Sequence, residues 1–386
     1  PELQPLEIKV ILQSLGFWIS GAGDVVKVAV PSWRPDVHGK ADLVEEVARI
    51  AGVNKIVPTP TPGLDGVARP VLTLNQTRTR RARRALAMRG MVEAGTRAFI
   101  AKSEAEAFGG GGRELELANP ISSEMSDMRP SLLAGLMLAA QRNVDRGIGD
   151  VALFEVGQIY RGDKPADQLT AATGIRRGTA GLAGSGRHWQ GAAPVVDAFE
   201  AKADALALLE ALGLNAGNVQ IAASAPDWFH PGRSGTLQLG PQTILGHFGE
   251  IHPRVLDKLD VAGPMVGFEL FLEMLPAPKA KPTRAKPPFQ ATAFQAVRRD
   301  FAFVVERDVT AAAILRAARG VDKKLIVDAS VFDLFEGASI GEGKKSVAIE
   351  VTLQPTEKTM TDDEIEAVAK KIVAAVVKTT GGTLRA

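Results

Sequence analysis

Two proline-rich stretches divide this 386-residue chain into segments. VPTPTPGLDG covers residues 57–66, and PAPKAKPTRAKPP covers residues 276–288. Proline fixes φ and lacks a backbone donor, so neither stretch can continue a helix or enter the middle of a sheet. The chain is also longer than one hydrophobic core usually serves. We therefore predict an α+β multidomain protein with domains at 1–70, 71–275 and 293–386, and a Pro/Lys-rich linker at 276–292.

The composition excludes several classes of site. The chain has no cysteine, which excludes disulfides, thiolate zinc sites, iron–sulfur clusters and cysteine nucleophiles. Its formal net charge is +2, so nucleic-acid binding would need a local basic patch. No apolar run approaches the roughly 20 residues of a membrane span, and no signal-peptide pattern opens the chain. We expect a cytoplasmic protein without a membrane partner. Because the chain begins at Pro1 rather than Met, we also expect a fragment of a longer protein.

The first segment has the pattern of a small α/β or winged-helix-like unit. Residues 6–17, LEIKVILQSLGF, have one apolar helical stripe that ends at a glycine. Residues 24–33, DVVKVAVPSW, alternate as a strand does. In residues 41–50, ADLVEEVARI, apolar side chains recur at i, i+4 and i+7, which indicates a second helix.

The stretch from Ser32 to Ile50 concentrates four carboxylates, namely Asp36, Asp42, Glu45 and Glu46. On a helix the last three span about 100° of one surface, and hard oxygen ligands of this kind suit Mg²⁺. The alternative is a helix start, in which Asp42 and Glu45 act as a capping pair and acids favour the macrodipole. Nearby cations could neutralise the remaining carboxylates: Arg34, Lys40 and Arg49. The spacing of the carboxylates alone favours the helix cap and does not exclude a metal site.

In the second segment strands outnumber helices, and short turns join many of them. We predict a largely antiparallel sheet with helices on one side. Residues 77–90, TRTRRARRALAMRG, form a basic helix that is either solvated or in contact with a nucleic acid or acidic partner. The glycine run 109–112 indicates a loop. His230, His247 and His252 match no zinc-ligand spacing.

The last segment has the order βαββαβ of a ferredoxin-like sandwich. Residues 336–346, EGASIGEGKKS, are interpreted as a hairpin loop, because Ala338 replaces the first glycine of a phosphate loop and a strand follows. From residue 294 onward there are 14 Lys+Arg and 14 Asp+Glu, so any RNA contact would use a local surface. The candidates for that surface are Arg298, Arg299, Phe301 and Phe303. Packing between sheet and helices is the alternative for the two rings.

Several motifs resemble one family. Residues 30–56, VPSWRPDVHGKADLVEEVARIAGVNKI, resemble the Mg²⁺-binding domain of the bacterial phenylalanyl-tRNA synthetase β subunit. Residues 117–137, LANPISSEMSDMRPSLLAGLM, and 245–256, LGHFGEIHPRVL, resemble its synthetase-like module. Residues 297–306, VRRDFAFVVE, and 359–365, TMTDDEI, resemble its C-terminal ferredoxin-fold anticodon-binding domain. The resemblance covers essentially the whole chain, in order.

The resemblance implies a set of functions. Asp36, Asp42, Glu45 and Glu46 match the family's Mg²⁺ ligands, in a site shared with the α subunit and structural in role. An α₂β₂ enzyme would join phenylalanine to its tRNA with ATP. The strand GFELFLEML ends without the arginine that grips ATP in class II synthetases, and the glycine series of that class is absent. We therefore assign no catalytic residue here and expect the chain alone to bind no ATP and to be inactive. The family's N-terminal tRNA-binding and editing domains would lie before Pro1.

The chain departs from the family pattern at a few positions. Gln295 and Ala296 replace a usual proline, Met360 replaces leucine, and Arg97 stands where Ser or Tyr is common. Two other functions stay open. One is a free-standing RNA-binding protein with a decayed synthetase module, and the other is a metal-dependent hydrolase that uses the acidic cluster.

Overall fold

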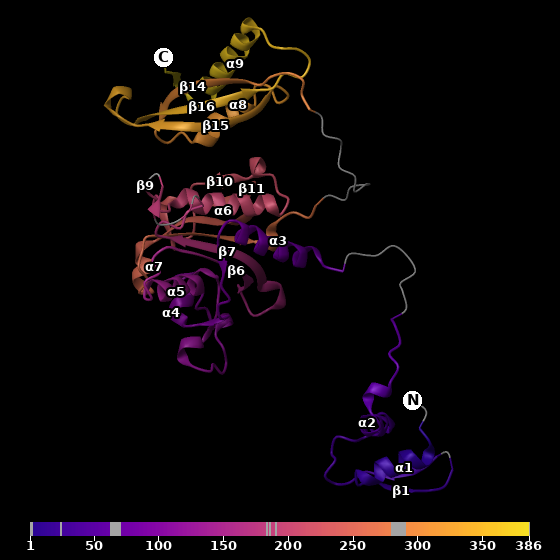
Figure 1. Ribbon diagram of the computed structural model, residues 1–386. Helices are drawn as coiled ribbons and strands as arrows, with labels where there is room; N and C mark the ends of the chain where they lie inside the picture. Colours follow the sequence, from indigo (N-terminus) through magenta and orange to yellow (C-terminus); the bar gives the residue numbers. More distant parts are fainter. Residues whose placement is uncertain are drawn as a thin grey trace. The chain divides into compact units, whose positions relative to one another are not determined.

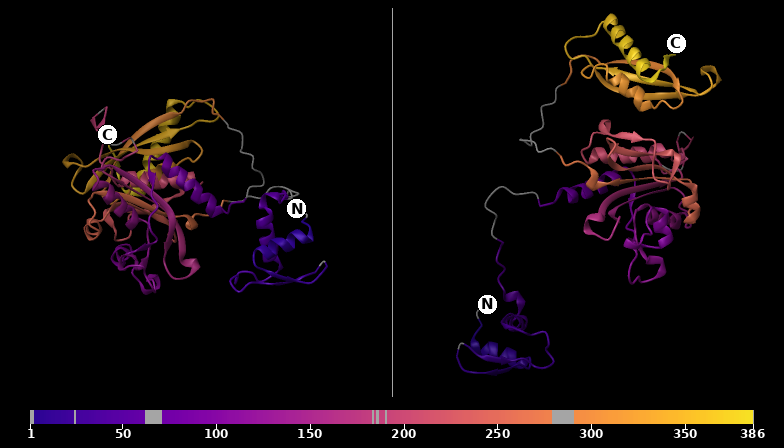
Figure 2. Two further views of the ribbon diagram at one scale, coloured as in Figure 1. Left: turned by 60° about the horizontal axis from the view of Figure 1, so that its bottom comes forward. Right: turned by 180° about the vertical axis from the view of Figure 1, so that it is seen from behind.

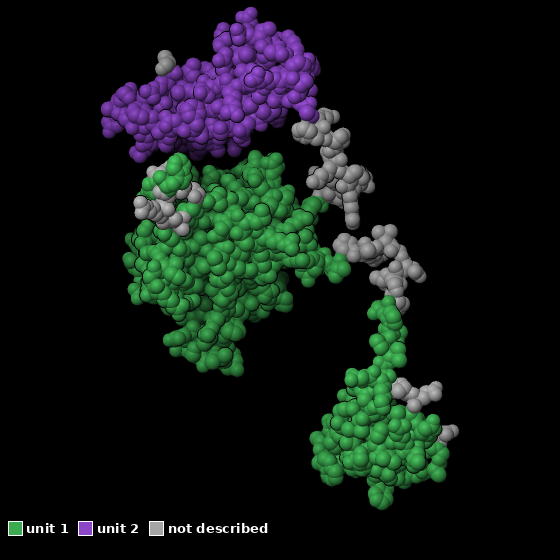
Figure 3. All heavy atoms as spheres, in the orientation of Figure 1, with its two compact units in different colours: residues 1–278 green, residues 279–386 purple. Residues whose placement is uncertain are grey.

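The computed structural model describes residues 3–23, 25–61, 71–182, 184, 187–189, 191–278 and 291–385. By its internal contacts the chain divides into two compact units, residues 1–278 and 279–386, which Figure 3 colours differently. The predicted linker and the first boundary fall largely on residues outside the described ranges, so the domain limits stay predictions. Among the residues that are described, no helix is both long and apolar enough to cross a membrane.

The N-terminal part is a helix–hairpin–helix unit with its own core. Its elements are α1 (Pro5–Ser14), β1 (Trp18–Ser20), β2 (Lys27–Ala29) and α2 (Lys40–Ala51), and β1 pairs antiparallel with β2. Ile11, Leu12, Phe17, Val37 and Val47 are buried together. The sequence predicted both helices and the second strand. It missed β1, whose residues Trp18–Ser20 lie close after the first helix and are not flanked by further alternating apolar residues as β2 is. The winged-helix-like class stays a prediction.

A seven-stranded sheet forms the middle of the chain, in the order β10-β11-β12-β13-β7-β6-β3. Every pairing in it is antiparallel except that of β3 with β6, so the predicted antiparallel character is confirmed. The strands are β3 (Val92–Glu93), β6 (Val151–Tyr160), β7 (Gln168–Arg177), β10 (Gln220–Ala222), β11 (Phe229–Leu239), β12 (Thr243–Ile251) and β13 (Met265–Phe271). The short pairs β4 (Phe99–Ile100) with β5 (Asp127–Met128) and β8 (Arg187–His188) with β9 (Gly191–Ala192) lie outside it.

Helices cover both faces of this sheet, so the expectation of one covered side is wrong (Figures 1 and 2). One face packs against α3 (Leu74–Met88) and α6 (Ala198–Ala211), and the other against α4 (Lys102–Ala107), α5 (Leu133–Val144) and α7 (Pro253–Lys258). The physical reason is visible in β13, which is buried at every position. Its alternate side chains enter two different cores, and a strand apolar on both sides needs cover on both.

The basic helix α3 is only partly solvated. Thr73 caps it and accepts a hydrogen bond from the Gln76 backbone. Arg78 is buried and donates to the carbonyls of Leu272 at 3.0 Å and Pro276 at 2.6 Å. These bonds fix α3 to the end of the segment, while Arg80, Arg81 and Arg84 remain exposed.

The C-terminal unit has the predicted βαββαβ order. Its elements are β14 (Val297–Glu306), α8 (Ala311–Arg319), β15 (Ile326–Phe335), β16 (Lys344–Leu353), α9 (Asp362–Thr380) and β17 (Thr383–Leu384). They form an antiparallel sheet in the order β15-β16-β14-β17, with α8 and α9 packed on it. The Thr361–Glu364 capping box is present, and residues 336–343 connect β15 to β16 as a hairpin loop. Both predictions are confirmed.

Candidate functional site

Arg34 organises the acidic cluster of the N-terminal unit. Its Nε and Nη2 donate to the two oxygens of Asp36 at 3.0 and 2.8 Å. Its Nη1 donates to Glu46 Oε2 at 2.8 Å, and Arg49 donates to the same oxygen at 2.8 Å. Glu46 is only 7% exposed, so its charge is neutralised inside the fold. The predicted neutralising role is confirmed for Arg34 and Arg49; no such bond is found for Lys40 among the described contacts.

Asp42 holds the start of α2. Its Oδ2 accepts from the backbone N–H of His38 at 2.7 Å and of Gly39 at 2.8 Å. The N-cap position belongs to Gly39, and Asp42 bonds back from the first turn. Glu45 is exposed and takes no part in this cap, so the predicted Asp42–Glu45 capping pair is corrected to Asp42 alone. No cation of the described residues lies within ion-pair distance of Glu45.

All of the bonded acids are stabilised in their ionised form. Hydrogen bonds from Arg34 lower the pKa of Asp36 to about 2, and bonds from Arg34 and then Arg49 lower the pKa of Glu46 to about 2. The backbone N–H groups of His38 and Gly39 lower the pKa of Asp42. The cluster is therefore a fixed negative charge at neutral pH, compensated in part by two arginines.

The donor chemistry of this cluster fits Mg²⁺, because all four candidate side chains are carboxylates, which offer hard oxygen donors. The four carboxylates do not close around one point, however, and no cluster of three or more His, Asp or Glu side chains able to hold a metal occurs in the described part of the chain. Arg34 pairs with both Asp36 and Glu46. Among the described contacts, Glu45, Oδ1 of Asp42 and Oε1 of Glu46 receive no hydrogen bond. The predicted metal site stays a prediction.

Replacing Arg34 with methionine is expected to raise the pKa values of both Asp36 and Glu46 towards the ordinary value of about 4. Lowered carboxylate pKa values stabilise the fold above that ordinary pKa, and the stabilisation is lost as the pH falls towards about 2. The variant should therefore lose its N-terminal unit at a higher pH than the wild type. Carboxyl ¹³C NMR titration gives the pKa values. Arg49→Met is the matched control and should move Glu46 while leaving Asp36 unchanged.

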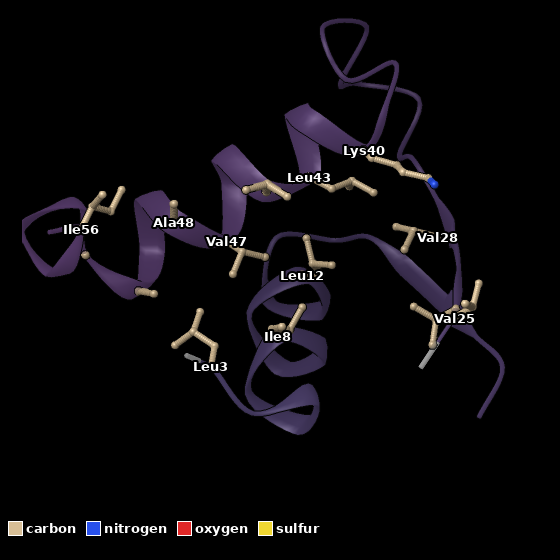
Figure 4. A pocket seen from close by; sticks show the side chains of 14 residues that line it. Leu3, Ile8, Leu12, Val25, Val28, Lys40, Leu43, Val47, Ala48 and Ile56 are labelled. Atoms are coloured by element: carbon tan, nitrogen blue, oxygen red, sulfur yellow. The ribbon is translucent and has the colours of Figure 1, made fainter. Parts of the chain in front are cut away.

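The same helix α2 borders an apolar groove of about 660 Å³. Its walls come from α1, β2 and α2, and Lys40 is its one charged lining residue among those described (Figure 4). The labelled side chains include Leu3, Ile8, Leu12, Val28, Leu43 and Val47. Val44, which lines the groove, is 67% exposed, and Trp33, which does not line it, is 70% exposed. This small unit thus combines anionic side chains at the start of α2 with uncovered apolar surface.

Comparison with known proteins finds a family model for each of the three segments of the chain. Residues 59–272 match the model of the phenylalanyl tRNA synthetase beta chain CLM domain. Residues 2–53 match the tRNA synthetase B5 domain, and residues 292–385 match the ferredoxin-fold anticodon binding domain. The chain belongs to the phenylalanyl-tRNA synthetase beta chain family.

Curated relatives of this family carry the name phenylalanine–tRNA ligase beta subunit. The chain is 61% identical to those of Bradyrhizobium diazoefficiens and Rhodopseudomonas palustris, over all of this chain and 48% of each relative. It is 59% identical to that of Mesorhizobium japonicum, over 97% of this chain and 47% of the relative. The chain therefore spans about half the length of the curated relatives it matches.

The four RNA-contact candidates of the anticodon-binding domain do not share a surface. Phe301 and Phe303 are 8% and 0% exposed and stack on each other at 6.2 Å inside the core. Neither ring is available to stack on a base, so core packing replaces that predicted role. Arg298 and Arg299 are neighbours on β14 and point to opposite sides of the sheet, towards Glu350 and Glu366 respectively. Arg298 is the more exposed, at 72% of its side chain.

The three histidines do not converge on a metal. His230 and His252 stack at 6.2 Å, and each accepts a backbone hydrogen bond on Nδ1, from Gly232 and Arg254. His247 lies on β12 and bonds Thr236 at 2.8 Å. The sequence did not single out the surroundings of His247, where charged groups from distant segments meet. A glutamate inside the apolar run MVGFELF of β13 was the available signal.

Proposed function

We propose that this chain is the part of a phenylalanine–tRNA ligase β subunit that supports the reaction without carrying it out. The proposal rests on three family models that follow one another along the chain and on relatives of that name that are 61% identical. The holoenzyme would be an α₂β₂ assembly that uses ATP and Mg²⁺ to attach phenylalanine to tRNA. The synthetase-like sheet of this chain contributes no catalytic residue and binds no ATP, so the chain alone is inactive.

The N-terminal unit is proposed to bind the α subunit through the surface at the start of α2. Exposed Trp33 and Val44 supply apolar contact, and the open carboxylate of Glu45 lies on the same helix as Asp42. Asp36, Asp42, Glu45 and Glu46 would hold a Mg²⁺ shared with α. Such an ion would supply positive charge to these carboxylates, and Arg34 already supplies part of that charge within this chain.

The ferredoxin-like unit is proposed to bind the anticodon region of tRNA. Its match to the anticodon-binding domain supports this role. Arg298 lies on the sheet face away from the helices and is proposed to contact the backbone of the RNA, and Arg299 sits beside it on the other face. Basic side chains of this kind supply salt-sensitive affinity rather than sequence discrimination.

Glu45→Gln is expected to weaken association with the α subunit by about tenfold in the presence of Mg²⁺, which corresponds to one charged contact. Because Glu45 has no partner among the described residues, its loss should leave the melting temperature of the chain unchanged. The measurement is a pull-down of the purified α subunit at graded Mg²⁺, with a thermal melt of each variant.

Glu46→Gln is the matched structural control. This substitution removes the partner of Arg34 and Arg49, so it should lower the melting temperature as well as α binding. If Glu45→Gln binds α as the wild type does at every Mg²⁺ concentration, the shared metal site is excluded and the cluster is a helix cap braced by arginines.

A further inference from the structure

A polar cavity of about 300 Å³ opens on the sheet face that α5 covers. Six stretches of the chain line it, and the exposed carboxylate of Glu114 is among the lining groups. The residues used in the argument are Arg161, Trp228, His247, Glu269 and Phe271. The volume lies at the lower end of ligand pockets, which hold roughly 300–1,000 Å³.

Glu269 provides a buried acceptor. It is 3% exposed, and its Oε1 accepts from Ser131 Oγ at 2.9 Å, Leu132 N at 3.0 Å and Thr173 Oγ1 at 3.0 Å. Burial raises the pKa of this carboxyl, and the three donated bonds and then the charge of Arg161 oppose the shift. No described donor reaches Oε2. A cation in the cavity would stabilise the ionised carboxylate.

His247 provides a second acceptor beside it. His247 and Glu269 are directly paired across β12 and β13, so their side chains are neighbours on one face. The hydroxyl of Thr236 gives its single proton to the Ser224 carbonyl at 2.6 Å, so the imidazole Nδ1–H must donate to Thr236 Oγ1. Burial, and then the charge of Arg161, lower the pKa of His247 to about 4. The ring is therefore neutral at pH 7, with an unprotonated Nε2.

Two donors complete the cavity. Trp228 Nε1 is buried and has no hydrogen-bond partner in the protein, although buried donors are nearly always paired. The Arg161 guanidinium lies over the Phe271 ring at 4.7 Å, and among the described residues no carboxylate is within ion-pair distance of it. Both groups can therefore donate a hydrogen bond to an anionic oxygen.

The glycine run forms the wall next to Trp228. Gly109 has φ of +79°, and a Cβ there would lie 3.3 Å from the Trp228 ring. A larger residue would be strained at this φ and would crowd the indole, so glycine keeps this part of the cavity open. Phe108, Trp228 and Phe271 make the remaining wall aromatic.

We propose that this cavity binds a free α-amino acid as a zwitterion, with its ammonium group at Glu269 and His247 and its carboxylate at Trp228 Nε1 and Arg161. A simple anion would leave the two acceptors unused, and a simple cation would leave the two donors unused. The site is separate from the acidic cluster and the anticodon-binding unit. It needs no α subunit and does not depend on the ligase role of the holoenzyme.

The test is saturation-transfer NMR of the common L-amino acids, including L-phenylalanine, with the purified 386-residue chain and no α subunit. At least one amino acid should show saturation transfer at millimolar concentration. Its analogues without the amino group or without the carboxyl group should bind about tenfold more weakly or worse, as expected for losing a charged hydrogen bond. If no amino acid binds, or if either analogue binds as well as its parent, the proposal is overturned.

Two variants locate the binding. Glu269→Gln keeps an oxygen for the three donors but removes the charge, and Trp228→Phe keeps a ring but removes the N–H. Each should weaken binding about tenfold, the effect of one charged or buried hydrogen bond. Glu273→Gln is the matched control, because Glu273 bonds Thr170 and Asn75 and does not line the cavity. Wild-type affinity in a folded Glu269→Gln or Trp228→Phe chain would overturn the assignment.

Discussion

Asp204→Ala is expected to lower the free energy of unfolding of the synthetase-like part by about 3–5 kcal/mol, the range for breaking a buried ion pair. Asp204 lies on α6 and is 1% exposed. Its carboxylate accepts from Arg176 at 2.6 and 3.1 Å and from Arg89 at 2.5 Å. Removing it leaves two guanidinium groups without a counter-charge, one of them only 2% exposed.

The measurement is hydrogen exchange at increasing urea, followed in peptides of α6 and β7. Glu210→Ala is the control on the same helix, because Glu210 is exposed and should change the free energy by no more than about 0.5 kcal/mol. A loss in Asp204→Ala as small as that of the control would mean that the carbonyls of Ala180 and Arg89, which already accept from Arg176, compensate the buried charge.

Local signals made the C-terminal unit predictable. The Thr361–Glu364 capping box and the alternation along β14 each involve residues that are close in the sequence. Each pattern therefore predicts one helix or strand without knowledge of the tertiary contacts. The Asp36, Asp42 and Glu46 bonds were predictable in part for the same reason, since Arg34 and Arg49 lie in the same stretch of chain.

Long-range contacts were not predictable in this way. The cavity joins Arg161, Trp228, His247 and Glu269, which no periodic pattern relates to one another. Likewise, the sequence of one strand does not identify the helices that cover it, although the apolar residues on both faces of β13 did indicate that both faces are covered. Phe301 and Phe303 show the remaining ambiguity, because alternation places both rings on one face but does not say whether helices or RNA cover that face.

Phe303→Ala is expected to destabilise the ferredoxin-like unit by about 3–5 kcal/mol, the usual loss for a large buried ring. Phe303 is 0% exposed and belongs to the same core as Phe301, Ile314 and Val376. Removing the ring leaves a cavity between β14 and the two helices. Hydrogen exchange in peptides of β14 and β16 measures the loss in this unit without interference from residues 1–278.

Phe303→Leu separates packing from base stacking. Leucine fills most of the space, so the cost should stay near or below about 1.5 kcal/mol, as for other apolar core exchanges. If the ring serves only the core, this variant should bind tRNA as the wild type does, because leucine restores packing but cannot stack on a base. Arg298→Ala should instead weaken tRNA binding. It should also reduce the slope of the logarithm of the binding constant against the logarithm of salt concentration by about one, as expected for losing one phosphate contact. Loss of tRNA affinity in a stable Phe303→Leu chain would mean that the strand opens to expose its ring to RNA, because the closed core leaves that side chain 0% exposed.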